Sequence, residues 1–311
     1  MMGDPEVVRV MTILVATGAG VHHPDHGDRP GLAGHDVTAL DPGGKWAIAD
    51  GKTLHHYTDA GWEEVAVVPG DPATALVAGP SGVYVGTAGA HLSRLDDDRL
   101  VPVHGFDAAP GRETWGTPWG GPPDVRSLAV APGGTVFVNV HVGGVVRSRD
   151  GGTTWEPTMD VDNDVHQVIV DAPSGTVLVA AAVGFGQSTD GGDSWRIDTT
   201  GLHATYSRAI ALADRYILLT ASDGPFTHRA GLYRRPLGTD TPFAKVTAGL
   251  PEWFEDNVDS HWVAARGHDA ALVTQGGDVY ASSDAGESWE RVGSGLPTPR
   301  ALAIPADEAS A

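Results

Sequence analysis

"SRDGGTTWEP" (residues 148–157) is the stretch that decides the fold, because close copies of it occur twice more in the chain. "STDGGDSWRI" follows at 188–197 and "SSDAGESWER" at 282–291, so the shared pattern is Ser-x-Asp-x-Gly-x-x-Trp. The first two copies start 40 residues apart, and the third starts 94 residues later, which is two units of 47. A period of this size is the sequence signature of a repeat architecture.

A second recurring segment marks the start of each unit. Seven short segments align without gaps: "HDVTALD", "DPATALV", "PDVRSLA", "NDVHQVI", "TYSRAIA", "VDSHWVA" and "PTPRALA". Each has small or β-branched apolar residues at alternate positions, as a half-buried strand does, and most precede a glycine-containing turn. Four short antiparallel strands repeated about every 40 residues form a β-propeller blade. The sequence therefore predicts an all-β, single seven-bladed β-propeller of four-stranded antiparallel blades.

The two ends of the chain are expected to meet in one blade of a single domain covering residues 1–311. "PRALAIP" near the C-terminus is an opening strand with no second strand after it, and "MTILVATGAG" is a second strand with no first. If the C-terminal strand completes the N-terminal blade, the ring closes and exposed sheet edges are removed. The expected blades are residues 299–305 with 11–34, then 35–70, 71–110, 121–160, 161–201, 202–250 and 251–297.

The composition narrows the class of protein and of partner. The 311-residue chain has no cysteine, which excludes disulfides and thiolate chemistry. Its formal net charge of −20 repels nucleic acid and anionic membranes, so neither is an expected partner. No apolar run approaches the roughly 20 residues of a membrane helix, and the N-terminus lacks the basic start of a signal peptide. We expect a cytoplasmic monomer without a cofactor.

The repeated phrase resembles the Asp-box, or BNR repeat, and the chain resembles the β-propeller superfamily that carries it. That superfamily includes sialidases, xyloglucan-active glycoside hydrolases, sortilin-type receptors and photosystem II stability and assembly factors, the last of these being closest in size. The resemblance implies a structural role for the phrase, on the hairpin between the third and fourth strands of a blade. An Asp in a tight turn accepts hydrogen bonds from backbone N–H groups, and the Trp packs between blades. The residues with this expected role are Asp150, Trp155, Asp190, Trp195, Asp284 and Trp289.

The innermost strand of each blade is where we expect functional residues, because in propellers it lines the central channel and its entry end faces the usual ligand site. The fourth position of the aligned segments holds three arginines and two histidines: Arg126, Arg208, Arg300, His166 and His261. Two positions earlier, on the same strand face, lie Tyr206 and four aspartates: Asp36, Asp124, Asp164 and Asp259. Arginines gathered at one mouth would attract an anionic ligand. The alternative is that they pair with the aspartates and hold neighbouring blades together.

The loops that feed the same face are rich in aromatic residues. "DAAPGRETWGTPWGGPP" carries Trp115 and Trp119, "LPEWFEDNVDSH" carries Trp253, and "TTGLHATYS" carries His203 and Tyr206. Exposed aromatic rings beside carboxylates are suited to a carbohydrate or another small organic ligand, and the same residue types are common in protein interfaces. Packing against the blades is the structural alternative. We predict a small, anionic or carbohydrate-like ligand, or a protein partner, at the channel mouth.

A sialidase-like glycoside hydrolase is one enzymatic alternative. That group carries an Arg-Ile-Pro motif near its start, an arginine triad, a Tyr–Glu pair and an acidic Asp. Here the only Ile-Pro is Ile304-Pro305, which lies at the other end of the chain without the preceding Arg, and Tyr206 has no assignable Glu. These departures argue against sialidase activity.

A small-molecule lyase or hydrolase is the other enzymatic alternative. His166 or His261 would be the general base, beside Asp164 or Asp259. His166, His261 and His203 would also be the residues to hold a metal ion, because they come from different blades that face one channel. We favour a non-catalytic binding propeller over either enzyme.

Overall fold

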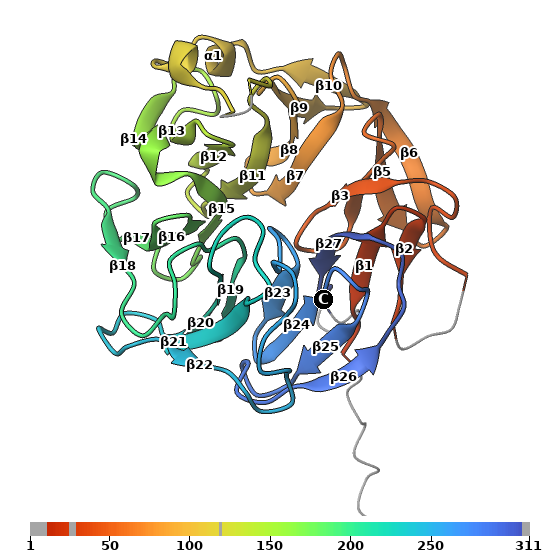
Figure 1. Cartoon of the computed structure of the whole chain (residues 1–311). Helices are drawn as coiled ribbons and strands as arrows, with labels where there is room; N and C mark the ends of the chain where they lie inside the picture. Colours follow the sequence, from red (N-terminus) through yellow and green to blue (C-terminus); the bar gives the residue numbers. More distant parts are fainter. Residues whose placement is uncertain (1–10, 25–28, 118–119, 307–311) are drawn as a thin grey trace, which may run out of the picture.

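Seven antiparallel sheets are arranged as a ring in the computed structural model, which describes residues 11–24, 29–117 and 120–306 (Figure 1). Each sheet radiates from the centre of the ring, and six of the seven have four strands. The predicted all-β, seven-bladed propeller is thus confirmed.

The strand bounds follow the repeat from blade to blade, in chain order from the centre of the ring outward. The first two complete sheets consist of β3 (Val37–Leu40), β4 (Trp46–Ala49), β5 (Thr53–Thr58) and β6 (Gly61–Val67), then β7 (Ala73–Gly79), β8 (Gly82–Thr87), β9 (Leu92–Asp96) and β10 (Arg99–Pro102). The next two consist of β11 (Val125–Val130), β12 (Val136–Val140), β13 (Gly144–Ser148) and β14 (Glu156–Met159), then β15 (Val165–Val170), β16 (Val177–Ala181), β17 (Gly184–Ser188) and β18 (Arg196–Asp198). The last two consist of β19 (Ile210–Ala213), β20 (Tyr216–Ala221), β21 (Gly231–Pro236) and β22 (Ala244–Lys245), then β23 (Val263–Arg266), β24 (Asp269–Val273), β25 (Val279–Ser282) and β26 (Glu290–Gly293).

The remaining sheet joins the two ends of the chain. β27 (Pro299–Ala303) pairs antiparallel with β1 (Leu14–Thr17), which pairs in turn with β2 (Gly20–His22). Among the described residues this blade has three strands, where four were expected, and the returning chain adds only an isolated bridge between Val21 and Gly31. Pro30 has no N–H group to donate, which limits pairing on this side.

Three single-turn helices complete the described elements: α1 (His104–Asp107), η1 (Arg112–Thr114) and η2 (Val161–Asn163). In the described part of the chain, no helix has the length and apolar character needed to cross a membrane.

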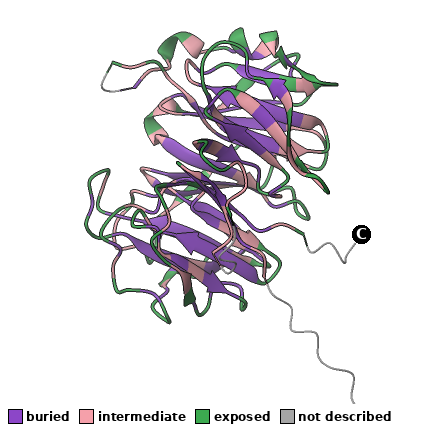
Figure 2. Cartoon of the chain, turned by 90° about the vertical axis from the view of Figure 1, so that its right-hand side faces the viewer, coloured by how far each residue is buried: buried purple, intermediate pink, exposed green. Residues whose placement is uncertain are grey.

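The core lies between the blades, where small and β-branched side chains of neighbouring sheets meet. β12 and β16 are buried along their whole length, while the exposed residues concentrate in the loops (Figure 2). The contact between blades is close at Gly86, where an added Cβ atom would lie 2.3 Å from Cγ1 of Val125. The apolar repeat of each strand therefore positions the inner ends of seven sheets around one channel.

The three repeated phrases form three similar turns, each between the third and fourth strands of its blade. In the first, the Asp150 carboxylate accepts hydrogen bonds from the Thr154 backbone N–H at 2.9 Å, from the Thr154 hydroxyl at 2.6 Å and from the Ser148 hydroxyl at 2.8 Å. These bonds, that of the Thr154 hydroxyl first, lower the pKa of Asp150 to about 2. The Trp155 indole N–H donates to the Gly152 carbonyl at 3.0 Å, so the ring is fixed against its own turn.

A cavity marks the blade in which the phrase has been lost. Arg147, directly before the first phrase, donates to the Gly191 carbonyl and to Asp193 in the turn of the next blade. Gln187 occupies the corresponding place before the second phrase, and the turn that it faces, residues 237–240, no longer has the pattern. A rim cavity of about 400 Å³ lies there, lined in part by Gln187, Trp195 and Arg235. The third and fourth strands thus pack less tightly where the repeat has changed.

Candidate functional site

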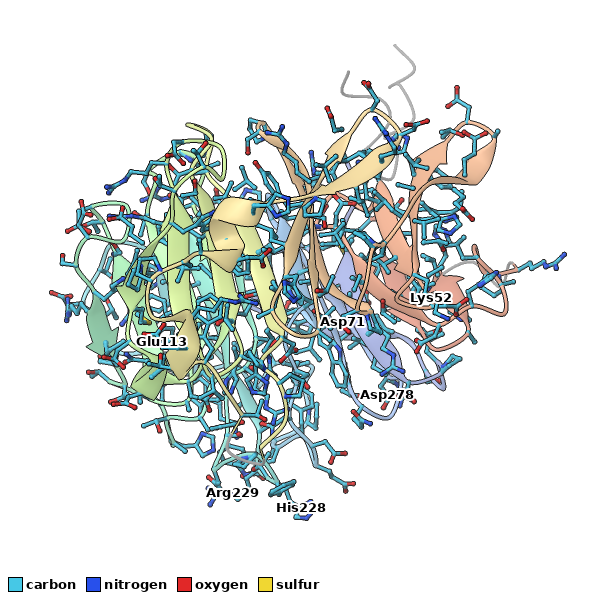
Figure 3. The ribbon with its side chains drawn as sticks, turned by 90° about the horizontal axis from the view of Figure 1, so that it is seen from above. Lys52, Asp71, Glu113, His228, Arg229 and Asp278 are labelled. Carbon is cyan, nitrogen blue, oxygen red and sulfur yellow. The ribbon has the colours of Figure 1, made fainter. Side chains whose placement is uncertain are left out.

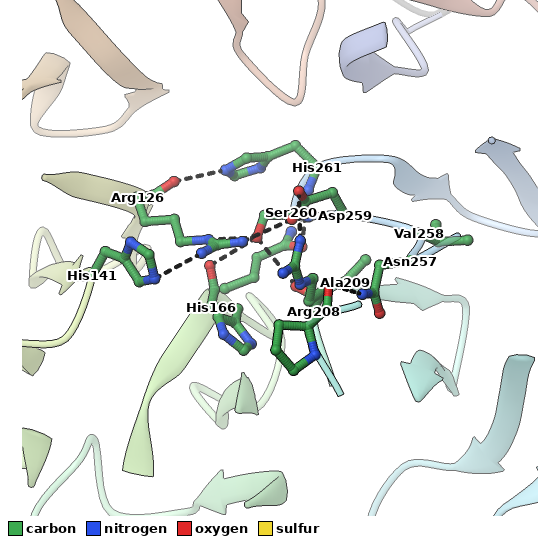
Figure 4. A network of polar contacts seen from close by, with 12 residues as sticks. Arg126, His141, His166, Arg208, Ala209, Asn257, Val258, Asp259, Ser260 and His261 are labelled. Carbon is green, nitrogen blue, oxygen red and sulfur yellow. Dashed lines mark hydrogen bonds and ion pairs between the residues drawn. The ribbon is translucent and has the colours of Figure 1, made fainter. Parts of the chain in front are cut away.

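One carboxylate, that of Asp259, binds two arginines at the centre of the ring (Figure 4). Its Oδ1 accepts from Nη2 of Arg126 at 2.7 Å, and its Oδ2 accepts from Nη1 of Arg208 at 3.0 Å. Arg126 lies on β11, Arg208 lies just before β19, and Asp259 lies on the chain entering β23. Three different blades therefore contribute to one ion-pair cluster.

A tight turn before β23 positions the carboxylate. The aligned segment "VDSHWVA" predicts a strand through these residues, but β23 begins only at Val263. The Trp262 N–H donates to the Asp259 carbonyl at 3.1 Å, and His261 has a φ of 64°. The hydroxyl of Ser260, in the middle of this turn, accepts from Nε of Arg126 at 3.0 Å and donates to the His166 carbonyl at 3.1 Å. In a regular strand, successive side chains would point to opposite faces. The turn instead brings the consecutive polar residues Asp259, Ser260 and His261 into the network at the centre of the ring.

The Asp259 carboxylate stays ionised in the cluster although it is partly buried. Burial alone would raise the pKa of Asp259, but the charges of Arg126 and Arg208 outweigh it and hold that pKa below its ordinary value. The two guanidinium groups and their shared carboxylate together carry one positive charge, and the carboxylate of Asp256 lies in the adjoining pocket. The buried Nε atom of Arg208 has no hydrogen-bond partner among the described residues.

A pocket of about 310 Å³ opens beside this cluster at the channel mouth. It is lined by Arg208, Asp259, Asp256, Asn257, Gln275 and the loop residues Pro225, Phe226, Thr227 and His228. Asn257 connects the two loops of the pocket, because its Oδ1 accepts from the Ser222 hydroxyl at 2.6 Å and its Nδ2 donates to the Gly224 carbonyl at 3.1 Å. Figure 3 shows that His228, with its neighbour Arg229, projects from one face of the ring.

His166 lies within hydrogen-bonding range of the same network but is buried completely. Its Nδ1 donates to the Ser207 carbonyl at 2.6 Å, and its Nε2 lies 3.5 Å from Oδ2 of Asp164. Burial lowers the pKa of His166, so the imidazole is neutral at pH 7. Next to it lies His141, which the sequence analysis missed, with Nε2 3.1 Å from Nη1 of Arg126 and Nδ1 3.3 Å from Oδ1 of Asp124. His141 follows β12 in a turn, outside the aligned segments, so the repeat gives no signal for it.

Two predicted site residues lie apart from the arginine pair. Arg300 forms its own double hydrogen bond with Asp36, at 2.9 Å from both Nε and Nη2, on exposed side chains. His203 donates from Nε2 to the Arg229 carbonyl at 3.0 Å, and its Nδ1 lies 2.7 Å from Tyr233 Oη. The expected grouping of three arginines is therefore reduced to Arg126 and Arg208, because the third has a carboxylate of its own.

The predicted histidine trio also does not assemble as a metal-ligating group in the described part of the chain. His261 Nε2 lies 3.2 Å from the Arg126 carbonyl, while the His203 ring packs at a tilt of 52° against Trp253, with 4.6 Å between ring centroids. His166 is instead grouped with His141 and Asp164.

The aromatic residues of the loops pack against their own neighbours more than was expected. Trp115 lies 5.6 Å from the ring of Phe106 and 5.0 Å from the guanidinium of Arg112. The Trp253 ring has Nζ of Lys245 at 3.0 Å and the guanidinium of Arg229 at 4.7 Å. Trp119 lies outside the described residues.

Tyr206 remains close to the arginine pair. Its hydroxyl accepts from Nη2 of Arg208 at 3.2 Å, and its ring lies 4.8 Å from that of His166. It therefore connects the arginine pair with the buried histidine.

Comparisons with known proteins show the fold. Neither a protein-family model nor a curated protein matches the sequence. An ancestral GH74 enzyme is similar in structure, with a TM-score of 0.59, 17% identity and coverage of 88% of this chain and 38% of its own length. A putative 6-phosphogluconolactonase from Bacteroides uniformis has a TM-score of 0.59 at 13% identity, covering 94% of this chain and 98% of its own. A structure of a nidogen/laminin complex contains a chain with a TM-score of 0.58 at 11% identity, covering 96% and 99%. The chain thus spans 38% of the length of the GH74 enzyme that it resembles.

Proposed function

We propose that this propeller binds a small hydroxylated carboxylate, such as a sugar acid, in the pocket at the channel mouth. The observation that carries the proposal is Arg208, which lines the pocket and shares the single Asp259 carboxylate with Arg126. The two guanidinium groups would be the positive partners of an anionic ligand in a protein that is otherwise strongly acidic.

The other pocket residues favour a ligand with hydroxyl groups. Asp256, Asn257, Thr227 and Gln275 supply hydrogen-bond acceptors and donors around the arginine. The volume of about 310 Å³ is at the lower end of ligand pockets, which suits a molecule of monosaccharide size. A carboxylate could pair with Arg208 and a neutral sugar could not, so charge is expected to decide selectivity.

The test is calorimetric titration of the full chain with glucuronate and with glucose as its neutral counterpart. Glucuronate is expected to bind and glucose to bind more weakly. The Arg208→Ala variant is expected to bind glucuronate at least about tenfold more weakly, because a hydrogen bond to a charged group is lost. Arg300→Ala is the matched control, since Arg300 occupies the same aligned position but pairs with Asp36 outside the pocket.

Three results would overturn the proposal: equal affinity for the two sugars, equal weakening by the two arginine variants, or no binding of sugar acids at millimolar concentration. Recovery of unchanged glucuronate after incubation would support binding over turnover.

A protein partner at the same mouth is the second candidate function. Phe226 lines the pocket and is 95% exposed, and an apolar ring so placed is typical of a residue that anchors a partner. The structural neighbour in the nidogen/laminin complex supports this use of the fold. If Phe226→Ser leaves the glucuronate affinity unchanged but abolishes association with a candidate protein, the hypothesis of a protein partner is favoured. Loss of glucuronate affinity would instead assign Phe226 to the small-molecule pocket.

A further inference from the structure

Three side chains with metal-ligating atoms gather beside the arginine pair. His141, Asp164 and His166 each offer one such atom, and these atoms all lie within 4.8 Å of one another. His141 comes from the turn after β12, Asp164 ends η2 and His166 lies on β15. The group therefore spans two neighbouring blades.

Hydrogen bonds fix which nitrogen of each ring carries the proton. The Ser207 carbonyl only accepts, so the bond of 2.6 Å places a hydrogen on Nδ1 of His166, and the neutral ring then has its lone pair on Nε2. Arg126 only donates, so its Nη1 at 3.1 Å requires a lone pair on Nε2 of His141. The hydrogen of His141 is then on Nδ1, which lies 3.3 Å from the Asp124 carboxylate. In each ring an oxygen acceptor therefore lies at Nδ1, and the basic Nε2 is on the opposite side of the ring.

Two buried acceptor atoms of this group, Nε2 of His166 and Oδ1 of Asp164, have no hydrogen-bond donor. The His166 side chain is fully buried, and its Nε2 has no hydrogen-bond partner. It lies 3.5 Å from Oδ2 of Asp164, and Oδ1 of Asp164 is also buried without a partner. A lone pair that faces a carboxylate is unfavourable unless a cation lies between them.

We propose that His141, Asp164 and His166 bind one divalent first-row transition metal ion, with zinc as the expected ion. Two neutral imidazoles and one carboxylate are a ligand set that zinc uses when a fourth position stays open. The Ser207 carbonyl and the Asp124 carboxylate are the outer partners that metal-bound histidines have in proteins.

Arg126 is the residue that competes with the metal. It donates to His141 in the metal-free arrangement, and its charge opposes a second cation nearby. On metal binding it would release His141 but keep its bonds to Asp259 and Ser260. Removal of this charge is therefore expected to tighten metal binding, whereas removal of a ligand weakens it.

The experiment is calorimetric titration of the full chain, first treated with EDTA, with zinc chloride, followed by the visible absorption of the Co²⁺ form. We expect one equivalent of zinc per chain. His166→Ala is expected to lose most of the affinity, and Asp124→Asn to lose about 10- to 100-fold, as changes of outer partners do. Arg126→Met is expected to bind zinc more tightly than the unchanged protein.

His203→Ala is the matched control, because His203 is bonded to Tyr233 and the Arg229 carbonyl and belongs to no metal-ligating group among the described residues. Its zinc affinity is expected to match that of the unchanged protein. Circular dichroism reports whether the buried His166→Ala variant folds; if it does not, Asp124→Asn and Arg126→Met decide the question, because they act in opposite directions. Absence of stoichiometric zinc binding, or equal affinity in all folded variants, would overturn the proposal and indicate adventitious binding by surface histidines.

Discussion

Replacement of Asp259 by Asn tests whether the central ion-pair cluster holds the propeller together. The change keeps the shape of the side chain but leaves Arg126 and Arg208 without their shared negative charge. Breaking a buried ion pair from one side costs about 3–5 kcal/mol, whereas an exposed pair contributes less than about 1 kcal/mol. The Asp259 side chain is 35% exposed and the two arginines are 15% and 19% exposed, so water screens the loss in part. We expect the free energy of unfolding to fall by about 2 kcal/mol.

The pH dependence of this loss has a definite sign. The pKa of Asp259 is lowered in the folded protein, so its charge stabilises the fold above the unfolded pKa of about 3.9. That stabilisation is lost as the pH falls further and the carboxylate takes up a proton. The difference between the unchanged protein and Asp259→Asn should therefore be constant above about pH 5 and shrink in more acidic solution.

Urea unfolding at several pH values, followed by circular dichroism, measures both effects. Asp36→Asn is the control, because it breaks an ion pair whose carboxylate also accepts two arginine hydrogen bonds, here both from Arg300, and the Arg300 and Asp36 side chains are 42% and 38% exposed. That control should cost less than about 1 kcal/mol. The reasoning is refuted if Asp259→Asn changes stability by less than about 0.5 kcal/mol, if its cost equals that of Asp36→Asn, or if the difference grows in acid.

Two further predictions concern the packing of the ring. Gly86→Ala should destabilise the protein by about 1–3 kcal/mol, because the new methyl group would overlap Val125 of the next blade. Gly133→Ala is the control, because no described atom lies within 4 Å of its new Cβ atom, and it should have little effect on the thermal midpoint. Equal midpoints for the two variants would contradict the close contact. Deletion of residues 299–311 should remove β27 and expose the edge of β1, giving oligomers or aggregates by size-exclusion chromatography with light scattering; a monomer that still unfolds cooperatively would show that the ring does not depend on this closure.

The fold was predictable because every blade repeats the same local chemistry. The three complete Asp phrases set the period, and the alternating apolar residues of the opening strands set the register of the inner strands. The exception is the blade closed by β27, where one strand fewer was found among the described residues than was expected. Its phrase keeps only Asp25 and Gly27, so the sequence there carried little information.

The site was only partly predictable, because its contacts join residues far apart in the chain. Arg126 and Asp259 are 133 positions apart, and the alignment placed both at the channel without indicating that Asp259 would bind two arginines. That outcome depends on the turn before β23, which departs from the repeat. His141 was missed because it lies on a turn that the alignment does not cover. The repeat therefore predicts the strand and the position of a side chain, whereas the residues that it contacts depend on segments that depart from the repeat.

The same aligned position serves two different purposes around the ring. On β3 and β7 it holds threonines, and their hydroxyls donate to backbone carbonyls of the next inner strand: Thr38 to Ala73 at 3.3 Å, and Thr74 to Val125 at 2.6 Å. Short side chains that bond to the adjacent blade stabilise the ring and leave no polar group free for a ligand. In the following blades the position holds Arg126, His166 and Arg208. The two arginines share the Asp259 carboxylate, whereas the buried His166 donates to the Ser207 carbonyl of the adjacent blade. We infer that the two blades with threonine use this position only to bond to the adjacent blade, whereas the blades with Arg126 and Arg208 use it to concentrate charge at the mouth.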